Sequence, residues 1–283
     1  MPNAPYHLAR LEGMMMRLLY RAALPIIARR KVRISREVAF DVFAYSGEST
    51  LPEQVASLRS FLTNVGRPRC FVIFSDGSYT ARNIRLLKRI DPVVEVSESL
   101  PSLPPELPEK IRQYLTTHST GKQLAVIMSL PLNNPALYTD SDVLFFPGAS
   151  ELANLAAAPS ASAYYLPDHR FSGDERLLLN AEEKENPVNI GLLLFFRKLD
   201  WSLGLGRLAK LEGPPSFFTG QTITHLCLPA NGAVPFDPQK FILQADDEFG
   251  YADRYANRSL AVRHYVNPIR HKFWAALAHQ ILK

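Results

Sequence analysis

The sequence predicts an α/β fold of three layers, in which helices cover both faces of a mixed, mainly parallel sheet. Apolar segments of strand length alternate with longer amphipathic segments in the first hundred residues, and this order is typical of right-handed βαβ units. Hydrophobic residues make up 47% of the 283-residue chain, which is enough for one large core. No internal repeat is present, so residues 36–283 are predicted to form a single domain.

Residues 1–35 are predicted to form a separate basic helix. Eight Arg and Lys against the one acid Glu12 give residues 1–36 a net charge of +7, whereas the remaining 24 basic and 26 acidic residues give −2. Between Tyr6 and Leu24, apolar residues fall on one stripe of a helix and arginines on another. The stripe consists of Leu8, Leu11, Met15, Leu18, Leu19 and Ala22, and the arginines are Arg10, Arg17 and Arg21.

Two interpretations of this helix remain open. In the first, the apolar stripe packs on the rest of the protein, as in most amphipathic helices. In the second, residues 6–31 lie on an anionic membrane at its inner face. Arg17 and Arg21 interrupt a signal-peptide core, and no apolar run reaches the roughly 18 residues of a membrane span. We therefore expect a cytoplasmic chain, with or without peripheral membrane contact.

Three strands and two helices are predicted between residues 38 and 96. In chain order they are Val38–Tyr45, Leu51–Val65, Cys70–Ser75, Tyr79–Ile90 and Val93–Val96. Ligands bind beyond the carboxyl ends of the strands in such sheets, which singles out Tyr45, Ser46 and Asp76 as candidate binding residues. Tyr45 can stack on a nucleotide base, and Asp76 can bond the base or its ribose. Closing a turn is an equally good explanation for each of them.

Several other features limit the possible functions. The proline-rich stretch Leu100–Pro108 predicts a surface connection between two lobes of the sheet. Cys70 and Cys227 are too few for a disulfide framework and are predicted to be buried, reduced thiols. No glycine-rich phosphate loop follows the first strand, which argues against NAD enzymes and P-loop NTPases. Because the basic excess lies on one helix, no nucleic-acid partner is expected.

Asp140 and Asp142 form a D-x-D motif within the apolar segment 136–146. Side chains two residues apart on an extended backbone share one face. Both carboxylates can therefore bind one divalent cation, which would offset the cost of burying them. A turn with two solvated acids is the alternative interpretation of such a short motif.

Two later segments fit the same chemistry. Asn189 and Gly191 open an apolar strand over residues 189–196, as expected where the backbone approaches a ligand closely. His264 precedes a cluster of cations near the end of the chain. Asn267 and Pro268 are predicted as the N-cap and first residue of a terminal helix that runs to about Leu282.

In this order, the three segments resemble glycosyltransferases of the GT-A fold. The closest resemblance is to the glycogenin-like and lipopolysaccharide galactosyltransferase-like family, known as family 8. It extends over about residues 36–274, although the sharp matches are confined to the short motifs. The resemblance implies a nucleotide-diphosphate sugar donor, UDP-linked by default, and transfer with retention of configuration. It also implies that Asp140, Asp142 and His264 hold Mn²⁺ or Mg²⁺, which stabilises the charge on the leaving diphosphate.

The resemblance also suggests roles for further residues. Asn189 and Gly191 would line the sugar pocket, and Gln221 would lie beside the reacting sugar carbon. Lys122, near the start of a helix predicted over Thr120–Leu130, would reach the donor. Arg270 or Lys272 would contact the diphosphate. The chain departs from the family pattern at Gly220, where an acid is usual, and at Asn267, where a glycine is usual.

Three alternative functions and the acceptor remain open. A haloacid-dehalogenase-type phosphatase would use Asp140 and Asp142 with the later pair Asp246 and Asp247, but about 100 residues of strands and helices precede its motif here. A nucleotidyltransferase would need an early basic loop, and a non-catalytic nucleotide-sugar binder would need only the site. The polar segment 167–188 is predicted to be a lid, an acceptor clamp or a solvated loop. The acceptor can be a saccharide, a lipid-linked sugar or a protein.

Overall fold

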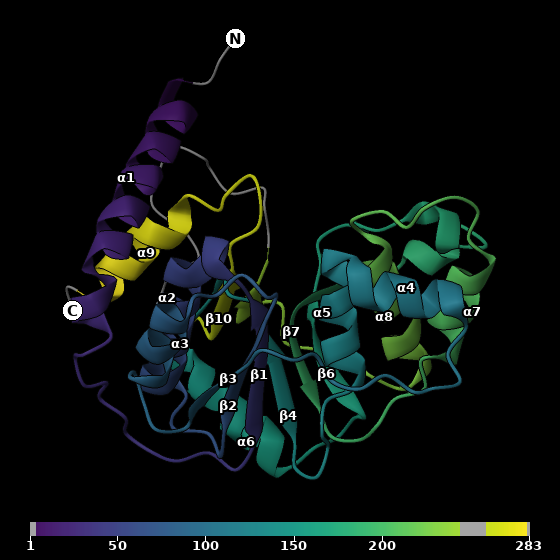
Figure 1. Ribbon diagram of the computed structural model, residues 1–283, viewed down its shortest axis with the longest axis horizontal. Helices are drawn as coiled ribbons and strands as arrows, with labels where there is room; N and C mark the ends of the chain where they lie inside the picture. The colour runs from purple at the N-terminus through teal and green to yellow at the C-terminus, as the bar shows by residue number, and fades with distance from the viewer. Residues whose placement is uncertain (1–3, 244–258, 282–283) are drawn as a thin grey trace.

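The computed structural model describes residues 4–243 and 259–281, and shows a large and a small sheet with helices on both faces (Figure 1). The large sheet has the strand order β3-β2-β1-β4-β7-β6-β8, and the small sheet has the order β5-β10-β9. The strands are β1 (Asp41–Ser46), β2 (Phe71–Ser75), β3 (Val94–Ser97), β4 (Ala136–Thr139), β5 (Val143–Phe145), β6 (Ala163–Pro167), β7 (Val188–Phe195), β8 (Val234–Pro235), β9 (Phe241–Ile242) and β10 (Val262–His264). The predicted α/β class is therefore confirmed.

Helices of different length connect these strands. The α-helices are α1 (Ala4–Ile27), α2 (Leu51–Asn64), α3 (Ala81–Lys88), α4 (Glu109–Thr117), α5 (Ser119–Met128), α6 (Glu151–Ala157), α7 (Ser202–Lys210), α8 (Thr219–Ala230) and α9 (Lys272–Ile281), and the 3₁₀ helices are η1 (Glu48–Thr50), η2 (Pro147–Ser150), η3 (Glu175–Leu177) and η4 (Glu182–Lys184). The five elements predicted between residues 38 and 96 are β1, α2, β2, α3 and β3, each within a few residues of its predicted bounds. The helix predicted over Thr120–Leu130 is α5.

The pairing of strands makes the sheet mixed. β3, β2, β1 and β4 run parallel, as βαβ units require, whereas β7 is antiparallel to both β4 and β6. The carboxyl ends of β1, β2 and β4 consequently lie at one edge of the sheet. Phe43 in β1 pairs with Tyr138 in β4, so the residues that follow these strands are level with each other.

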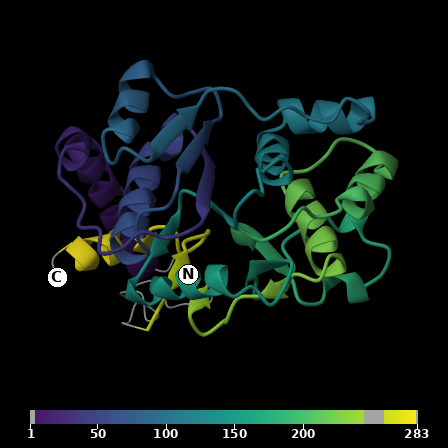
Figure 2. The same ribbon diagram turned by 90° about the horizontal axis from the view of Figure 1, so that it is seen from below.

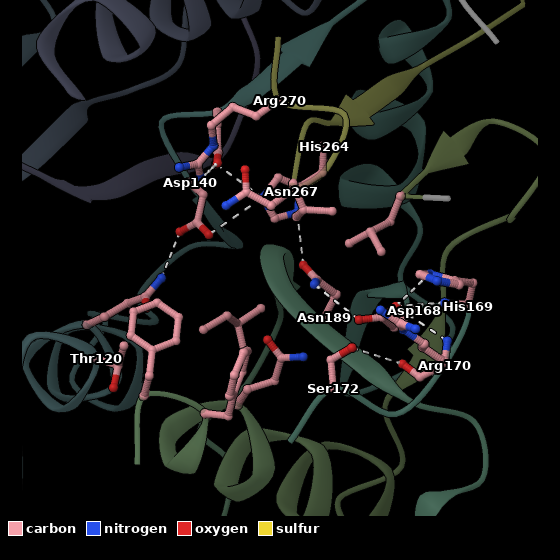
Figure 3. A pocket seen from close by; sticks show the side chains of 18 residues that line it. Thr120, Asp140, Asp168, His169, Arg170, Ser172, Asn189, His264, Asn267 and Arg270 are labelled. Atoms are coloured by element: carbon pink, nitrogen blue, oxygen red, sulfur yellow. Dashed lines mark hydrogen bonds and ion pairs between the residues drawn. The ribbon is translucent and has the colours of Figure 1, made fainter. Parts of the chain in front are cut away.

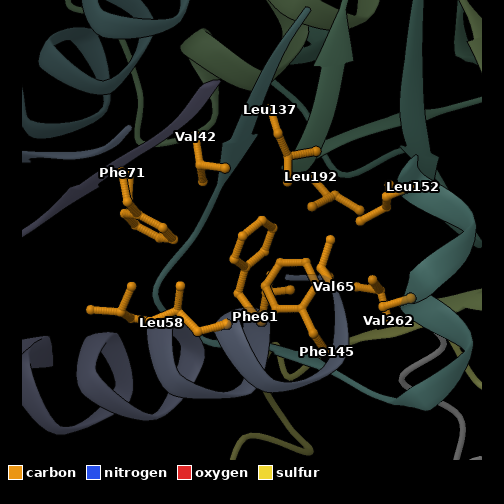
Figure 4. Packing of buried hydrophobic residues seen from close by; sticks show 14 of the residues in the cluster. Val42, Leu58, Phe61, Val65, Phe71, Leu137, Phe145, Leu152, Leu192 and Val262 are labelled. Atoms are coloured by element: carbon orange, nitrogen blue, oxygen red, sulfur yellow. The ribbon is translucent and has the colours of Figure 1, made fainter. Parts of the chain in front are cut away.

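Successive residues of the central strands serve two different cores. Val42, Leu137 and Leu192 face α2, where the ring of Phe61 lies 5.1 Å from the ring of Phe145, measured between ring centroids (Figure 4). Their neighbours in the chain, among them Tyr138, face the lobe formed by α4, α5, α7 and α8. Figures 1 and 2 show the segment Leu100–Pro108 crossing from β3 to α4 in that lobe.

The end of the chain differs from the prediction. The terminal helix α9 begins at Lys272, so the prediction that Asn267 and Pro268 start it is wrong. The backbone N–H groups of Ile269 and Lys272 instead donate to carbonyls three residues earlier, which closes two successive turns. These turns bring the Arg270 side chain back onto Asp142.

Helix α1 packs against α9 and α2 (Figure 1), but not through its predicted apolar stripe. Its buried face carries Tyr20, whose ring centroid lies 5.2 Å from that of Trp274, and Arg17, whose Nε lies 2.5 Å from Glu53 Oε1. All six residues of the stripe are exposed. The interpretation that the stripe packs on the protein is therefore wrong.

Two remaining predictions can be compared with the structure. Cys227 is buried and Cys70 is half-buried, and both thiols are free. No helix within residues 4–243 and 259–281 has the length and apolar character needed to cross a membrane.

Candidate metal and donor site

Asp140, Asp142 and His264 meet at the junction of the two sheets. Asp140 follows the last residue of β4, and Asp142 precedes the first residue of β5. β10 pairs antiparallel with β5 so that His264 lies opposite Val143. As a result, His264 Nε2 lies 3.1 Å from Asp142 Oδ1 and 3.9 Å from Asp140 Oδ2. One ligand atom from each of the three side chains lies within 4.8 Å of the other two, a spacing that one metal ion can bridge.

Asn189 fixes the orientation of the His264 ring from the side opposite the two carboxylates. The side-chain oxygen of Asn189 accepts a hydrogen bond from the backbone N–H of Gly191 at 2.8 Å and lies 3.0 Å from His264 Nδ1. Because an amide oxygen only accepts, Nδ1 must carry a proton. In the neutral imidazole the lone pair is therefore on Nε2, which faces the two carboxylates. This is the arrangement that supports a metal-binding histidine.

The pKa values of the three side chains in the cluster are shifted in different directions. Burial raises the pKa of Asp140 to about 6, and the charge of Asp142 adds to the rise. Burial acts in the same direction on Asp142, but His264 and Arg270 outweigh it and hold the pKa of that carboxyl well below its ordinary value. Burial lowers the pKa of His264, but the two carboxylates outweigh it and the pKa is raised. A divalent cation would relieve the repulsion between the carboxylates, so these three residues fit a metal.

A cavity of about 370 Å³ adjoins this cluster (Figure 3), a size found for small-molecule sites. Its walls come from α5, α8, β7, the segment after β6 and the segment after β10. Six predicted site residues line it: Asp140, Asp142, Asn189, Gln221, His264 and Arg270. Residues from positions 120 to 270 thus converge on one pocket.

Three predicted binding residues lie outside this lining, at the ends of β1 and β2. The Ser46 hydroxyl lies 2.8 Å from the hydroxyl of Tyr79. Asp76 accepts hydrogen bonds from the backbone N–H and hydroxyl of Ser78, so it closes a turn. Tyr45 is half-buried, and burial together with the charge of Asp76 raises its pKa to about 12. All three share the carboxyl edge of the sheet with Asp140.

The other three predicted residues also lie outside the lining. Lys122 is half-buried on α5, and Lys272 is buried at the first position of α9. Gly191 lies directly behind the metal cluster. A Cβ atom at Gly191 would be 2.3 Å from both Cε1 and Nδ1 of His264. Only glycine leaves room for the imidazole at this position.

Sequence reasoning missed several residues of the pocket. Gln123 donates to Asp140 Oδ1 at 2.8 Å and to the hydroxyl of Tyr138 at 3.0 Å, and Tyr138 also donates to Asp140. For Tyr138 a signal was available: side chains alternate along a strand, which places Tyr138 on the same face as Asp140. The exposed pair Phe217 and Phe218, which also lines the pocket, gave no comparable signal.

Within the segment 167–188, the regular parts are the last residue of β6, the 3₁₀ helices η3 and η4, and the first residue of β7. Two hydrogen bonds connect the segment to α8. The backbone N–H of Asp174 donates to the hydroxyl of Thr222 at 2.6 Å, and Thr219 donates to Asp174 Oδ2 at 2.7 Å. Asp168, His169 and Arg170, at the start of the segment, line the pocket. Its first part therefore faces the pocket, and its second part is anchored.

The acid that the resemblance leads one to expect at Gly220 would be tightly packed, and its neighbours would have to shift by a few tenths of an ångström. A Cβ atom there would lie 3.0 Å from the hydroxyl of Tyr114 and 3.1 Å from the carbonyl of Thr120. Gln221, the next residue of α8, does line the pocket.

The chain is similar to several solved glycosyltransferases. The galactosyltransferase LgtC, in complex with donor and acceptor sugar analogs, is 14% identical over 84% of this chain and 95% of its own, with a TM-score of 0.55. The bifunctional glycosyltransferase WbbM is 12% identical over 89% of this chain and 51% of its own, with a TM-score of 0.56. Mouse xyloside xylosyltransferase 1 is 11% identical over 82% of this chain and 98% of its own, with a TM-score of 0.53.

These similarities show that the chain has the GT-A glycosyltransferase fold, which confirms the predicted fold. No protein-family model matches the sequence, and no curated protein matches it.

Proposed function

We propose that this chain is a metal-dependent glycosyltransferase that uses a nucleotide-diphosphate sugar, with UDP-sugars as the first choice. The observation that carries the proposal is the cluster of Asp140, Asp142 and His264 at the base of a pocket in a GT-A fold. Neither a phosphatase nor a simple binding protein is supported by the similar structures, which are glycosyltransferases. Asp246 and Asp247, which a phosphatase would use, lie outside the described residues.

In this proposal Asp140, Asp142 and His264 hold the cation. The donor set of two carboxylates and one imidazole favours Mn²⁺ over Mg²⁺, because Mg²⁺ prefers oxygen ligands. When bound, the cation would stabilise the negative charge that develops on the departing diphosphate. Asn189 keeps the imidazole turned toward the carboxylates, and Gln123 orients Asp140.

We place the donor along the carboxyl edge of the sheet. Tyr45, Ser46 and Asp76 would face the nucleoside, with Lys122 on the neighbouring helix. Arg270 is a better diphosphate contact than Lys272, because Arg270 lines the pocket and Lys272 is buried outside it. Arg270 is now the counterion of Asp142, and its side chain is 52% exposed. A bound cation would take over that role and allow Arg270 to turn to the diphosphate.

The sugar would lie between Asn189 and Gln221, which are on opposite walls of the pocket. Gly191 would be on the same side as Asn189. LgtC also has an active-site glutamine, whose glutamate variant has been solved. We propose transfer with retention of configuration, which NMR of the product anomer would test. The acceptor would enter past Arg170 and the exposed rings of Phe217 and Phe218.

Replacing Gln221 by Ala is expected to lower the transfer rate by about 10²-fold, because an uncharged dipole beside the reacting carbon is removed. Mn²⁺ affinity should stay the same, since Gln221 touches none of the three proposed ligands in the hydrogen-bond network. Kinetic assays and Mn²⁺ titration of the same preparation measure both. Equal losses in rate and in Mn²⁺ affinity would contradict this role.

Replacing Asn189 by Ala is expected to weaken Mn²⁺ binding by about 10- to 100-fold, because the imidazole loses the acceptor that fixes its tautomer. The conservative variant Asn189→Asp keeps an acceptor beside His264 Nδ1 and should retain most of the affinity. Calorimetric titration with Mn²⁺ compares the two variants. If the alanine and aspartate variants bind Mn²⁺ equally well, Asn189 does not position His264.

The function is tested by incubating the full chain with a panel of nucleotide sugars, with and without Mn²⁺. We expect metal-dependent release of the nucleoside diphosphate from one donor. Thermal unfolding should show stabilisation by that donor only with Mn²⁺, by about 3 kcal/mol at a hundredfold excess over Kd. Hydrolysis of p-nitrophenyl phosphate would instead indicate a phosphatase, and binding without any turnover would indicate a non-catalytic binder.

A further inference from the structure

Helix α1 presents a continuous apolar surface to solvent. Leu8 is 66% exposed and Ile26 is 61% exposed, at opposite ends of the surface. The helix periodicity of 100° per residue places its members on one side of α1. We call it the α1 apolar face: Leu8, Leu11, Met15, Leu18, Leu19, Ala22 and Ile26. Such a large exposed apolar surface marks an interaction site.

The helix is held firmly while this face stays uncovered. The opposite side of α1 carries the contacts of Tyr20 with Trp274 and of Arg17 with Glu53, and Leu24 is buried in the main core. Near the N-terminal end, a Cβ atom at Gly13 would lie 2.8 Å from the carbonyl oxygen of His271, so the two backbones are close together. The exposed residues are thus one face of a docked helix.

Cations border the α1 apolar face. Arg10 and Arg21 are exposed along one side of it, at helical positions next to Met14 and Leu18. Beyond the C-terminal end of the helix, Arg29, Arg30 and Lys31 are also exposed. Glu12 is the one acid among residues 4–36. Glu12 lies on the other side of the face, and Arg21 also pairs with Glu48 at 3.4 Å between Nη2 and Oε1. A partner for this surface must therefore be apolar at its centre and negatively charged along the side and the end that carry the cations.

We propose that α1 lies in the plane of an anionic membrane and inserts its apolar face at the boundary of headgroups and acyl chains. An apolar stripe bordered by Arg and Lys is the arrangement that such interfacial helices use, and each cation near the surface adds to the attraction of anionic lipids. A second copy of the chain is a poorer partner, because its matching face carries the same excess of cations and does not supply the negative charge that they attract. The proposal does not depend on sugar transfer.

The test is sedimentation of the full chain with vesicles. We expect binding to vesicles of phosphatidylcholine with about one-third phosphatidylglycerol, much weaker binding to phosphatidylcholine alone, and release by high salt. The double variant Leu11→Glu, Leu18→Glu should lower the partition coefficient by tenfold or more. Leu179→Glu is the matched control, because Leu179 is 76% exposed but lies far from α1 in the sequence and outside this face. The control should sediment like the unmodified chain.

Three results would overturn the proposal. One is the absence of sedimentation with anionic vesicles, and another is sedimentation that the double variant does not reduce. The third is a stable dimer in lipid-free solution that Leu11→Glu, Leu18→Glu converts to a monomer, which would assign the face to a second copy. Circular dichroism of each variant checks that the fold is intact, and a folded single variant, Leu18→Glu, replaces the double variant if the latter does not fold.

Discussion

Replacing Asp142 by Asn is expected to lower metal-dependent sugar transfer by more than about 10³-fold, because charge stabilisation at the leaving group depends on the cation. Asp142 is the proposed ligand with the closest contacts to the rest of the site: His264 Nε2 lies 3.1 Å away, and Arg270 pairs with its other oxygen. The isosteric amide keeps the shape but loses the charge that attracts Mn²⁺. Transfer assays over a range of Mn²⁺ concentrations measure the loss.

Asp237→Asn is the control for this experiment. Asp237 is an exposed carboxylate outside the pocket lining, so its variant should keep full activity. Circular dichroism of both variants separates loss of the site from loss of the fold. An Asp142→Asn enzyme with unchanged turnover and unchanged Mn²⁺ dependence would show that this carboxylate does not hold the cation.

Replacing Gly191 by Ala is expected to weaken Mn²⁺ binding by about 100-fold, since the new methyl group would overlap the ring that supplies the nitrogen ligand. The methyl carbon would lie 2.3 Å from two atoms of His264 and 2.9 Å from Asn189 Oδ1. His264 is buried, so the ring must turn away from the carboxylates or the backbone must shift. We also expect the free energy of unfolding to fall by about 1–3 kcal/mol. Calorimetric titration and denaturant unfolding measure the two effects.

Gly206→Ala is the matched control for Gly191→Ala. Gly206 lies in α7, and a Cβ atom there would meet no other atom within 4 Å. The control should keep its Mn²⁺ affinity and should gain up to about 1 kcal/mol of stability, because alanine favours a helix over glycine. Equal Mn²⁺ affinity in the two alanine variants would mean that the fit of His264 against Gly191 is unimportant.

The elements that sequence periodicity predicted well are those with local signals. β1, α2, β2, α3 and β3 follow each other with clear changes between strand and helix periods. The strand predicted over residues 189–196 is a long apolar run, and it corresponds to β7, which covers residues 188–195.

The small sheet was not predictable from local patterns. β10 has three residues, and its partner β5 lies about 120 positions earlier, so no periodicity reveals the pairing. The link between His264 and the two aspartates came from the family resemblance, and the structure brings these residues together. The start of α9 was misplaced because Asn267 and Pro268 are suited equally to a helix start and to a turn.

The apolar stripe of α1 shows a different limit. Helical periodicity identified the stripe correctly, but it does not say which face of a helix meets the protein. Tyr20, Arg17 and Gly13, all outside the stripe, make the contacts with α2 and the C-terminal segment. On α5, the family resemblance singled out Lys122, whereas its neighbour Gln123 binds Asp140.

The most direct measurement is anomalous X-ray scattering from crystals that contain Mn²⁺ and UDP. We predict one strong manganese peak within coordination distance of carboxylate oxygens of Asp140 and Asp142 and of His264 Nε2, with diphosphate oxygens on its open side. A peak at another position, or full UDP density at this pocket with no manganese beside these three side chains, would contradict the proposed metal site.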